Sequence, residues 1–181
     1  MEQGRPAGKV PGPGGNGPGA RARRTDPAIY SQMRRAALET RLQNLARDAV
    51  HLVLMDWHVD KGTVTVVAAA DGSASLYLSG GGGYIGGSEK VPAIREAALH
   101  AVALATGLRF YFERTETSPL PSLGDVTFYI TTSVGVSRAV AAESKLRAGA
   151  DPLAGLGGAM QRIVTEYRLR FGKASKAEPG E

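Results

Sequence analysis

Six glycines stand among the eight residues from Gly80 to Gly87, between a strand-like run and a helix-like run. Glycine loses more backbone entropy on folding than any other residue, so such a cluster indicates a required backbone conformation, a close backbone approach or mobility. This glycine segment can cradle an anion, let a partner approach, or cross the end of a sheet. The elements on either side of it decide which fold the chain can adopt.

Three strand-like runs precede the glycine segment. The apolar period is two from residue 51 to residue 79, and the turn sequences Asp60-Lys61-Gly62 and Asp71-Gly72 interrupt it. The apolar positions are Val53, Met55, Trp57, Val59, Val64, Val66, Ala68, Leu76 and Leu78. Short turns between alternating runs predict an antiparallel three-stranded meander.

A helix is predicted on each side of the meander. The first begins with Asp26 as N-cap and Pro27 at the first helical position, and runs to about residue 48. One face carries Leu38, Leu42, Leu45 and Ala49, and the other carries Arg34, Arg35, Glu39, Arg41 and Arg47. The second helix runs from Pro92 to Thr106 and is closed by Gly107. Its apolar arc of small residues implies close packing on the sheet: Ala97, Ala98, Ala101, Val102 and Ala105.

Two more strands and a last helix are predicted in the C-terminal half. Leu108, Phe110 and Phe112 alternate as a fourth strand, which a loop with Pro119 and Pro121 follows. A long fifth strand, bulged or bent by Gly135, carries Val126, Phe128, Ile130 and Val134. Residues 151–158 are expected to be irregular. A final helix over about residues 159–171 presents Met160, Ile163, Val164 and Tyr167 on one side.

The order α-βββ-α-ββ-α, with helices flanking a largely antiparallel sheet of about five strands, predicts an α+β fold. This order is similar to that of roadblock, longin and profilin-like domains, which implies a scaffold that dimerises through a helix or an edge strand. The runs Ser75-Leu76-Tyr77-Leu78-Ser79 and Val126-Thr127-Phe128-Tyr129-Ile130, with the glycine segment and the Ala-rich helix, resemble a family of short, uncharacterised bacterial proteins. That resemblance covers most of residues 50–171 and implies no activity.

Both ends of the chain differ in composition from its middle. Residues 1–26 are rich in Gly and Pro and hold five basic residues against two acidic ones, which is +3 of the net charge of +5. We expect a disordered basic arm at 1–26, one domain at 27–171 and a disordered tail at 172–181. Arg21, Arg23 and Arg24 can attract nucleic acid or an acidic surface. The absence of interleaved aromatic residues favours a merely solvating arm.

The chain has 181 residues and no cysteine, which excludes disulfides, thiolate metal sites and a cysteine nucleophile. Its first residues lack the apolar region of a signal peptide. No apolar run approaches the roughly 18 residues of a membrane span. We therefore expect a soluble cytoplasmic protein that has no membrane partner.

Gly81-x-Gly83-x-x-Gly86 matches the dinucleotide fingerprint, with a strand before it, a helix after it and Glu113 at the end of the next predicted strand. The preceding strand belongs to a tight-turn meander, whereas a Rossmann first strand is parallel and buried on both faces. A P-loop is rejected because Gly87 stands where lysine must reach the phosphates. Backbone N–H groups near Ser88 can still hold a small anion at the helix start.

Asp56, His58 and Asp60 alternate, so they share one face of the first strand, where they can hold a metal or let a carboxylate orient an imidazole. The solvent face of an antiparallel strand is the favoured alternative, because no second cluster of His or acidic residues completes a site. Glu113, Glu116 and Asp125 can form a carboxylate pair only if the fold brings them together. No serine lies in a nucleophile elbow.

The complete candidate loop is Gly80, Gly81, Gly82, Gly83, Tyr84, Ile85, Gly86, Gly87 and Ser88. Tyr84 and Ile85 either pack back on the domain or insert into a partner or a second subunit. Because no coherent catalytic set is present, we expect a non-enzymatic, cofactor-free interaction or assembly module that binds a protein partner or itself. The alternative is a nucleotide- or phosphate-binding protein, such as an oxidoreductase, that uses this loop. Parallel pairing of the strands around residues 74–79 and 108–113 would favour the alternative.

Overall fold

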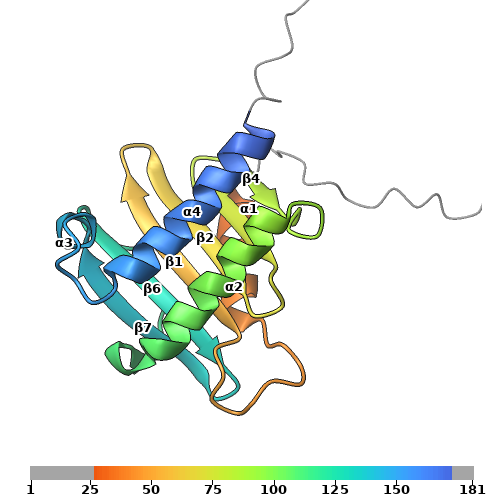
Figure 1. Ribbon diagram of the computed structural model, residues 1–181. Coiled ribbons are helices and arrows are strands. Elements are labelled where there is room, and N and C mark those ends of the chain that lie inside the picture. The colour runs from red at the N-terminus through yellow and green to blue at the C-terminus, as the bar shows by residue number, and fades with distance from the viewer. Residues whose placement is uncertain (1–26, 173–181) are drawn as a thin grey trace, which may run out of the picture.

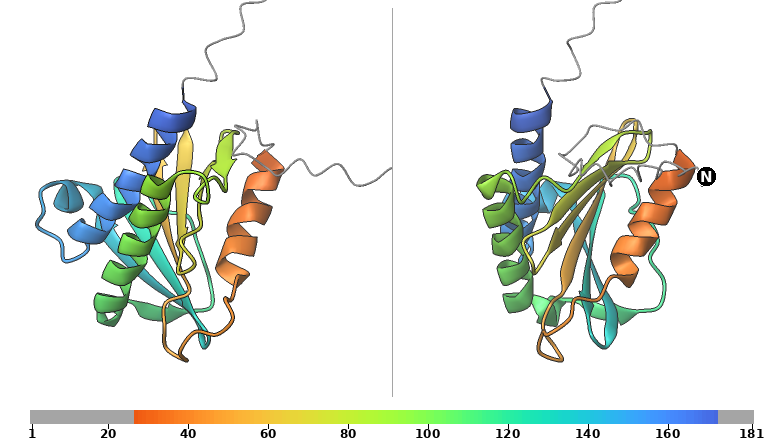
Figure 2. Two further views of the ribbon diagram at one scale, coloured as in Figure 1. Left: turned by 45° about the vertical axis from the view of Figure 1, so that its right-hand side comes forward. Right: turned by 90° about the vertical axis from the view of Figure 1, so that its right-hand side faces the viewer.

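The computed structural model describes residues 27–172, which form one sheet with helices on both faces (Figures 1 and 2). Helix α1 (Pro27–Glu39) lies on one face, and α2 (Pro92–Gly107) and α4 (Ala154–Phe171) lie side by side on the other. The expected basic arm, with Arg21, Arg23 and Arg24, and residues 173–181 of the expected tail lie outside the described residues.

The sheet has seven strands in the order β4-β3-β2-β1-β6-β7-β5, and every neighbouring pair is antiparallel. Its strands are β1 (Leu52–Val59), β2 (Gly62–Ala69), β3 (Ala74–Leu78), β4 (Gly83–Ile85), β5 (Glu113–Thr115), β6 (Asp125–Thr132) and β7 (Gly135–Ala142). The predicted α+β class and the meander β1-β2-β3 are confirmed, while the count of five strands is wrong. Among the described residues, no helix is both long and apolar enough to cross a bilayer.

Helix α1 ends at Glu39, about nine residues earlier than its apolar spacing predicts. Side chains take up its last carbonyl groups: the Thr40 hydroxyl donates to Ala36 O, and Arg41 Nη1 donates to Leu38 O. Asn44 then adopts a left-handed φ of 63°. The later residues of the predicted apolar face therefore lie in a loop, and Leu45 is exposed.

The predicted strand at residues 108–112 is wrong. Helix α2 tightens instead into a 3-10 turn, Arg109–Tyr111, in which Tyr111 N donates to Leu108 O and Phe112 N to Arg109 O. Phe110 is 72% exposed, so of the two phenylalanines only Phe112 enters the core. Helical continuation satisfies the backbone groups that a strand would have left for a ladder.

The predicted long fifth strand is a hairpin. Strand β6 ends at Thr132 and β7 begins at Gly135, whose φ of +136° suits glycine. Val134 lies in the turn between them and is exposed. The residues predicted to be irregular contain the start of α4, which is preceded by a short helix, α3 (Glu143–Arg147).

Two apolar layers hold the fold together. On the α2 and α4 side, β1, β2 and β6 bury Val53, Met55, Val66 and Phe128 against the small residues of α2 and against Met160, Ile163 and Tyr167 of α4. On the α1 side, Tyr30 and Leu38 cover a second cluster of strand residues: Leu52, Leu54, Val67, Tyr77 and Tyr129. Strand β1 is therefore buried on both faces along its first five residues, four of which form a continuous apolar run.

Candidate functional site

The glycine segment builds an edge strand rather than a loop alone. Gly83, Tyr84 and Ile85 form β4, which pairs with β3 through Tyr77, Leu76 and Ser75. Within residues 27–172 no further strand pairs with β4. Within these residues, the backbone groups on the outer edge of β4 have no partner strand. Strand β4 carries no charged side chain.

The ladder register determines which backbone groups of β4 face outward. Leu78 N donates to Gly82 O across the turn that joins β3 and β4. Hydrogen-bonded pairs alternate along an antiparallel ladder, so Leu76 and Tyr84 form the next one. The N–H and C=O groups of Gly83 and Ile85 consequently point away from β3, toward the free edge.

Gly83 is required by close packing of the backbone. Its φ is +152°, and a Cβ atom added to it would lie 2.4 Å from Leu76 O and 3.2 Å from Tyr77 Cα. Gly86 also has a positive φ, +71°, but nothing lies within 4 Å of the place where its Cβ would be. The segment therefore combines one sterically enforced glycine with others that serve backbone conformation.

The two apolar side chains of the segment point to opposite faces of the sheet. The Tyr84 ring stacks on Tyr167 of α4, with centroids 5.4 Å apart and planes 10° apart, and Phe171 lies 5.9 Å from it. The Tyr167 hydroxyl lies 2.6 Å from Ala74 O and 2.8 Å from Gly86 O, and it shares its one proton between these two carbonyl acceptors. Tyr84 thus anchors β4 to α4, whereas Ile85 is 51% exposed on the α1 side.

An apolar groove of about 340 Å³ separates α1 from this edge of the sheet. Met33 lines it from α1, Leu52, Val67 and Tyr77 line it from the strands, and Ile85 stands at its β4 end. Ala36 and Ala37 on α1 leave the groove open because their side chains are small. The free edge of β4 and an apolar surface therefore adjoin each other.

A buried polar network fixes α1, the far wall of this groove, against the sheet. Arg34 Nε and Nη2 donate to Asp56 Oδ2 at 2.9 and 2.6 Å, and the Thr65 hydroxyl donates to Asp56 Oδ1 at 2.5 Å. Arg34 Nη1 also donates to Ser118 O, so the loop before β6 is tied in as well. Burial raises the pKa of the Asp56 carboxyl, and the hydrogen bonds from Arg34 and Thr65 act in the opposite direction.

This network corrects two expectations. The sequence pattern favours a solvent face for Asp56, but this residue is fully buried. The pattern also predicts that Arg34 lies on the outer face of its helix, but it is only 7% exposed. His58 is half-buried and Asp60 is exposed at the following turn. Among residues 27–172, no group of three or more His, Cys, Asp or Glu side chains is arranged to hold a metal.

The surroundings of the glycine segment differ from those of a dinucleotide site. Strand β3 is antiparallel to both of its neighbours, and Glu113 lies on β5 at the opposite edge of the sheet. Ser88 is buried, and Lys90 N and Val91 N both donate to Gly87 O, so neither N–H is left to bind an anion. This arrangement gives no support to phosphate binding at the segment.

The candidate carboxylate pair is also separated. Glu113 is opposite Arg138 in the β5–β7 ladder, and Asp125 is opposite Ala142 in the β6–β7 ladder. Four residues along β7 correspond to about 13 Å, because a strand rises about 3.3 Å per residue. These acids do not share a site.

Comparison with protein-family models, curated proteins and solved structures found no match to this chain.

Proposed function

We propose that the protein is a non-enzymatic interaction module whose β4 edge binds an extended segment of a protein partner, with a second copy of the chain as the first candidate. One observation carries the proposal: β4 offers outward backbone groups of Gly83 and Ile85 directly beside the apolar groove. Strand addition uses such a combination, with main-chain hydrogen bonds for affinity and side-chain pockets for specificity.

The geometry of β4 is compatible with pairing to its own copy. In an antiparallel pair centred on Tyr84, Gly83 of one chain stands opposite Ile85 of the other. Both residues have outward N–H and C=O groups, so each such pair can exchange two hydrogen bonds. The pattern is its own complement, as an isologous interface requires.

The two edges of the sheet differ in a way that supports the proposal. Strand β5 at the far edge carries Glu113 and Arg114, both exposed. Charged side chains on an edge strand discourage pairing with another chain. Strand β4 has no charged side chain, and an unprotected edge strand exposes a protein to aggregation unless a partner pairs with it.

We further propose that the domain is related to the roadblock, longin and profilin-like group, and to the uncharacterised bacterial family that its strand and glycine sequences resemble, acting in the bacterial cytoplasm. The support is the order of the main elements, α1, β1-β2-β3, α2, β6-β7 and α4, which β4, β5 and α3 extend. Domains of that group serve as scaffolds, which agrees with an interaction module.

The test compares Ile85→Lys with Leu99→Lys, an equal change at an exposed leucine on the outer face of α2. Sedimentation velocity over a concentration series should show self-association in the parent and in Leu99→Lys, and loss of it in Ile85→Lys. Amide exchange of Gly83 and Ile85 should be slower in the associated parent than in Ile85→Lys, because paired amides are protected.

Nucleotide addition provides the opposing test. A ligand present at a hundred times its dissociation constant stabilises a fold by about 2.7 kcal/mol. We expect NAD(P) and ATP to leave the melting temperature unchanged. The proposal would be wrong if nucleotide raised the melting temperature saturably in the parent but not in Gly83→Val, and if Ile85→Lys left self-association unchanged. The protein would then be a nucleotide-binding protein.

A further inference from the structure

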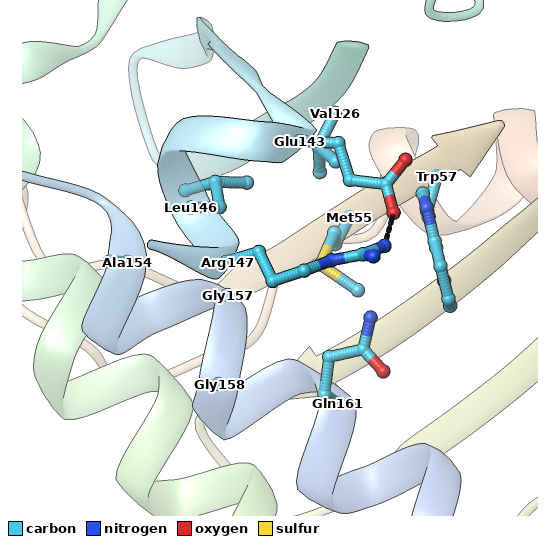
Figure 3. A pocket seen from close by; sticks show the side chains of 10 residues that line it. All are labelled: Met55, Trp57, Val126, Glu143, Leu146, Arg147, Ala154, Gly157, Gly158 and Gln161. Carbon is cyan, nitrogen blue, oxygen red and sulfur yellow. Dashed lines mark hydrogen bonds and ion pairs between the residues drawn. The ribbon is translucent and has the colours of Figure 1, made fainter. Parts of the chain in front are cut away.

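A second hollow lies on the opposite face of the sheet, where α3 and the first turns of α4 cover the end of β1 (Figure 3). It measures about 330 Å³, and Met55, Val126 and Leu146 form its apolar floor. Pockets that bind small molecules begin at about this size and are mostly apolar, with a few polar groups that orient the ligand. The hollow is separate from the apolar groove beside α1, and nothing inferred here depends on strand addition at β4.

Trp57 forms one side of the hollow and carries an unused donor. Its Nε1 atom is buried and has no hydrogen-bond partner within residues 27–172. Figure 3 shows the indole beside the hollow, with its nitrogen at the end where the Glu143 carboxylate lies. An indole N–H can only donate, so its missing partner is an acceptor.

Glycine on α4 keeps the hollow open. Gly158 lines it, and nothing lies within 4 Å of the place where a Cβ would be. Glycine inside a helix is destabilising relative to alanine, and packing does not require it at this position. The space that Gly158 leaves is therefore part of the hollow itself.

The rim holds further donors. Arg147 pairs with Glu143, but its side chain is 77% exposed, so this pair is weak and open to exchange with solvent or another anion. Gln161 of α4 stands on the same rim, as Figure 3 shows. The one carboxylate of the rim is already engaged by Arg147, so donors outnumber free acceptors.

We propose that this hollow binds a small carboxylate that carries a flat apolar group. The apolar group lies on the Met55 floor against the indole. The carboxylate accepts from Trp57 Nε1–H and from Arg147, which exchanges Glu143 for the ligand. Arginine is well suited to this role because its planar guanidinium matches a carboxylate.

Trp57 is the single tryptophan of the chain, so its fluorescence reports on this hollow alone. The probes are 3-phenylpropionate, 3-phenylpropionamide and 3-phenylpropylamine, which share one ring and differ in charge. We expect a saturable fluorescence change with the carboxylate, at least tenfold tighter than with the amide or the amine. For a ligand of this size, half-saturation is expected at or below about 10 mM.

Two matched variants locate the site. Gly158→Leu should abolish the response because leucine occupies the hollow, whereas Gly155→Leu, on the same helix and equally free of neighbours within 4 Å, should not. Arg147→Gln should bring the affinity for the carboxylate down to that for the amide. Equal binding of the three probes, preference for the amine, absence of saturation, or full binding in a folded Gly158→Leu protein would each overturn the proposal.

Discussion

Arg34 on α1 and Asp56 on β1 form a buried ion pair in which two guanidinium nitrogens, Nε and Nη2, donate to the same oxygen, Oδ2. The guanidinium also lies over the Tyr129 ring, 5.3 Å from its centroid. Helix α1 contacts the sheet through few large apolar residues, so the ion pair and the ring contact fix its position on the sheet. The position of α1, and with it the width of the apolar groove, depends on this pair.

Removing the cation should therefore be costly. We expect Arg34→Met to lower the free energy of unfolding by about 3 to 5 kcal/mol at pH 7, because it leaves the Asp56 carboxylate buried and unpaired. The double variant Arg34→Met with Asp56→Leu should recover most of that loss. Urea unfolding of the four proteins at one pH measures the coupling, and independent, additive losses would contradict it.

The cost of Arg34→Met should depend on pH. Burial raises the pKa of the Asp56 carboxyl above its value in the unfolded state, which is about 3.9. The folded state therefore binds this proton more tightly than the unfolded state does. Without Arg34 that rise is larger. Stability of the variant should then increase relative to the parent as the pH falls from 7 to 5, and a loss that is constant over this range would show that the carboxylate is not the cause.

Tyr30 should make the fold sensitive to alkali. Burial, the largest cause, raises its pKa to about 12, and the Tyr30 hydroxyl donates to Thr65 Oγ1, whose own proton goes to Asp56 Oδ1. The stability linked to this hydroxyl is present below about pH 10, where the unfolded tyrosine ionises, and is lost as the pH rises through about 12. Between pH 9 and pH 11, the unfolding free energy of the parent should fall by about 1 kcal/mol more than that of Tyr30→Phe. Equal slopes would mean that this hydroxyl is not shielded.

Gly83 and Gly86 should respond differently to the same change. Gly83→Ala places a methyl group against Leu76 O and should cost about 3 kcal/mol, whereas Gly86→Ala pays only for its left-handed backbone, about 1 kcal/mol. Melting temperatures of the two variants, measured side by side, test this. Equal and small shifts would mean that β4 does not lie against β3 as described.

Tyr84 and Ile85 should separate stability from association. Tyr84→Ala removes the stack on Tyr167 and should lower the unfolding free energy by about 2 kcal/mol. Ile85→Ser changes an exposed side chain and should stay within about 0.5 kcal/mol of the parent. Chemical denaturation decides this, and a larger loss for Ile85→Ser than for Tyr84→Ala would reverse the assignment of anchor and exposed residue.

Elements with strong periodicity were predictable from the sequence. The meander, α2 and the apolar face of α4 follow from regular spacing and from turn residues such as Asp71-Gly72. The end of α1 was not, because Leu42 and Leu45 continue the helical spacing while Thr40 and Arg41 cap the backbone. Strand β4 has only three residues and lies among glycines. Its local sequence pattern does not indicate a strand, because β4 forms by pairing with β3.

The buried pair illustrates a second limit. Alternation along β1 indicates one apolar face, but it cannot tell whether Asp56 on the other face meets water or a cation from another element. Arg34 is 22 residues away in sequence, on a helix whose other arginine, Arg35, is exposed. An acidic residue flanked by strongly apolar neighbours was the available signal, and it becomes decisive only when the tertiary partner is known.

The unequal edges of the sheet set a limit on growth. A filament built by strand addition needs a pairing-competent edge strand at both ends of the sheet in every subunit, because each added subunit must bind the next one. Here β5 carries the exposed charged side chains of Glu113 and Arg114, whereas β4 carries no charged side chain. Under the proposed pairing, two chains joined through β4 present the charged β5 strands at the ends of their shared sheet, which disfavours further strand addition there and favours a closed pair.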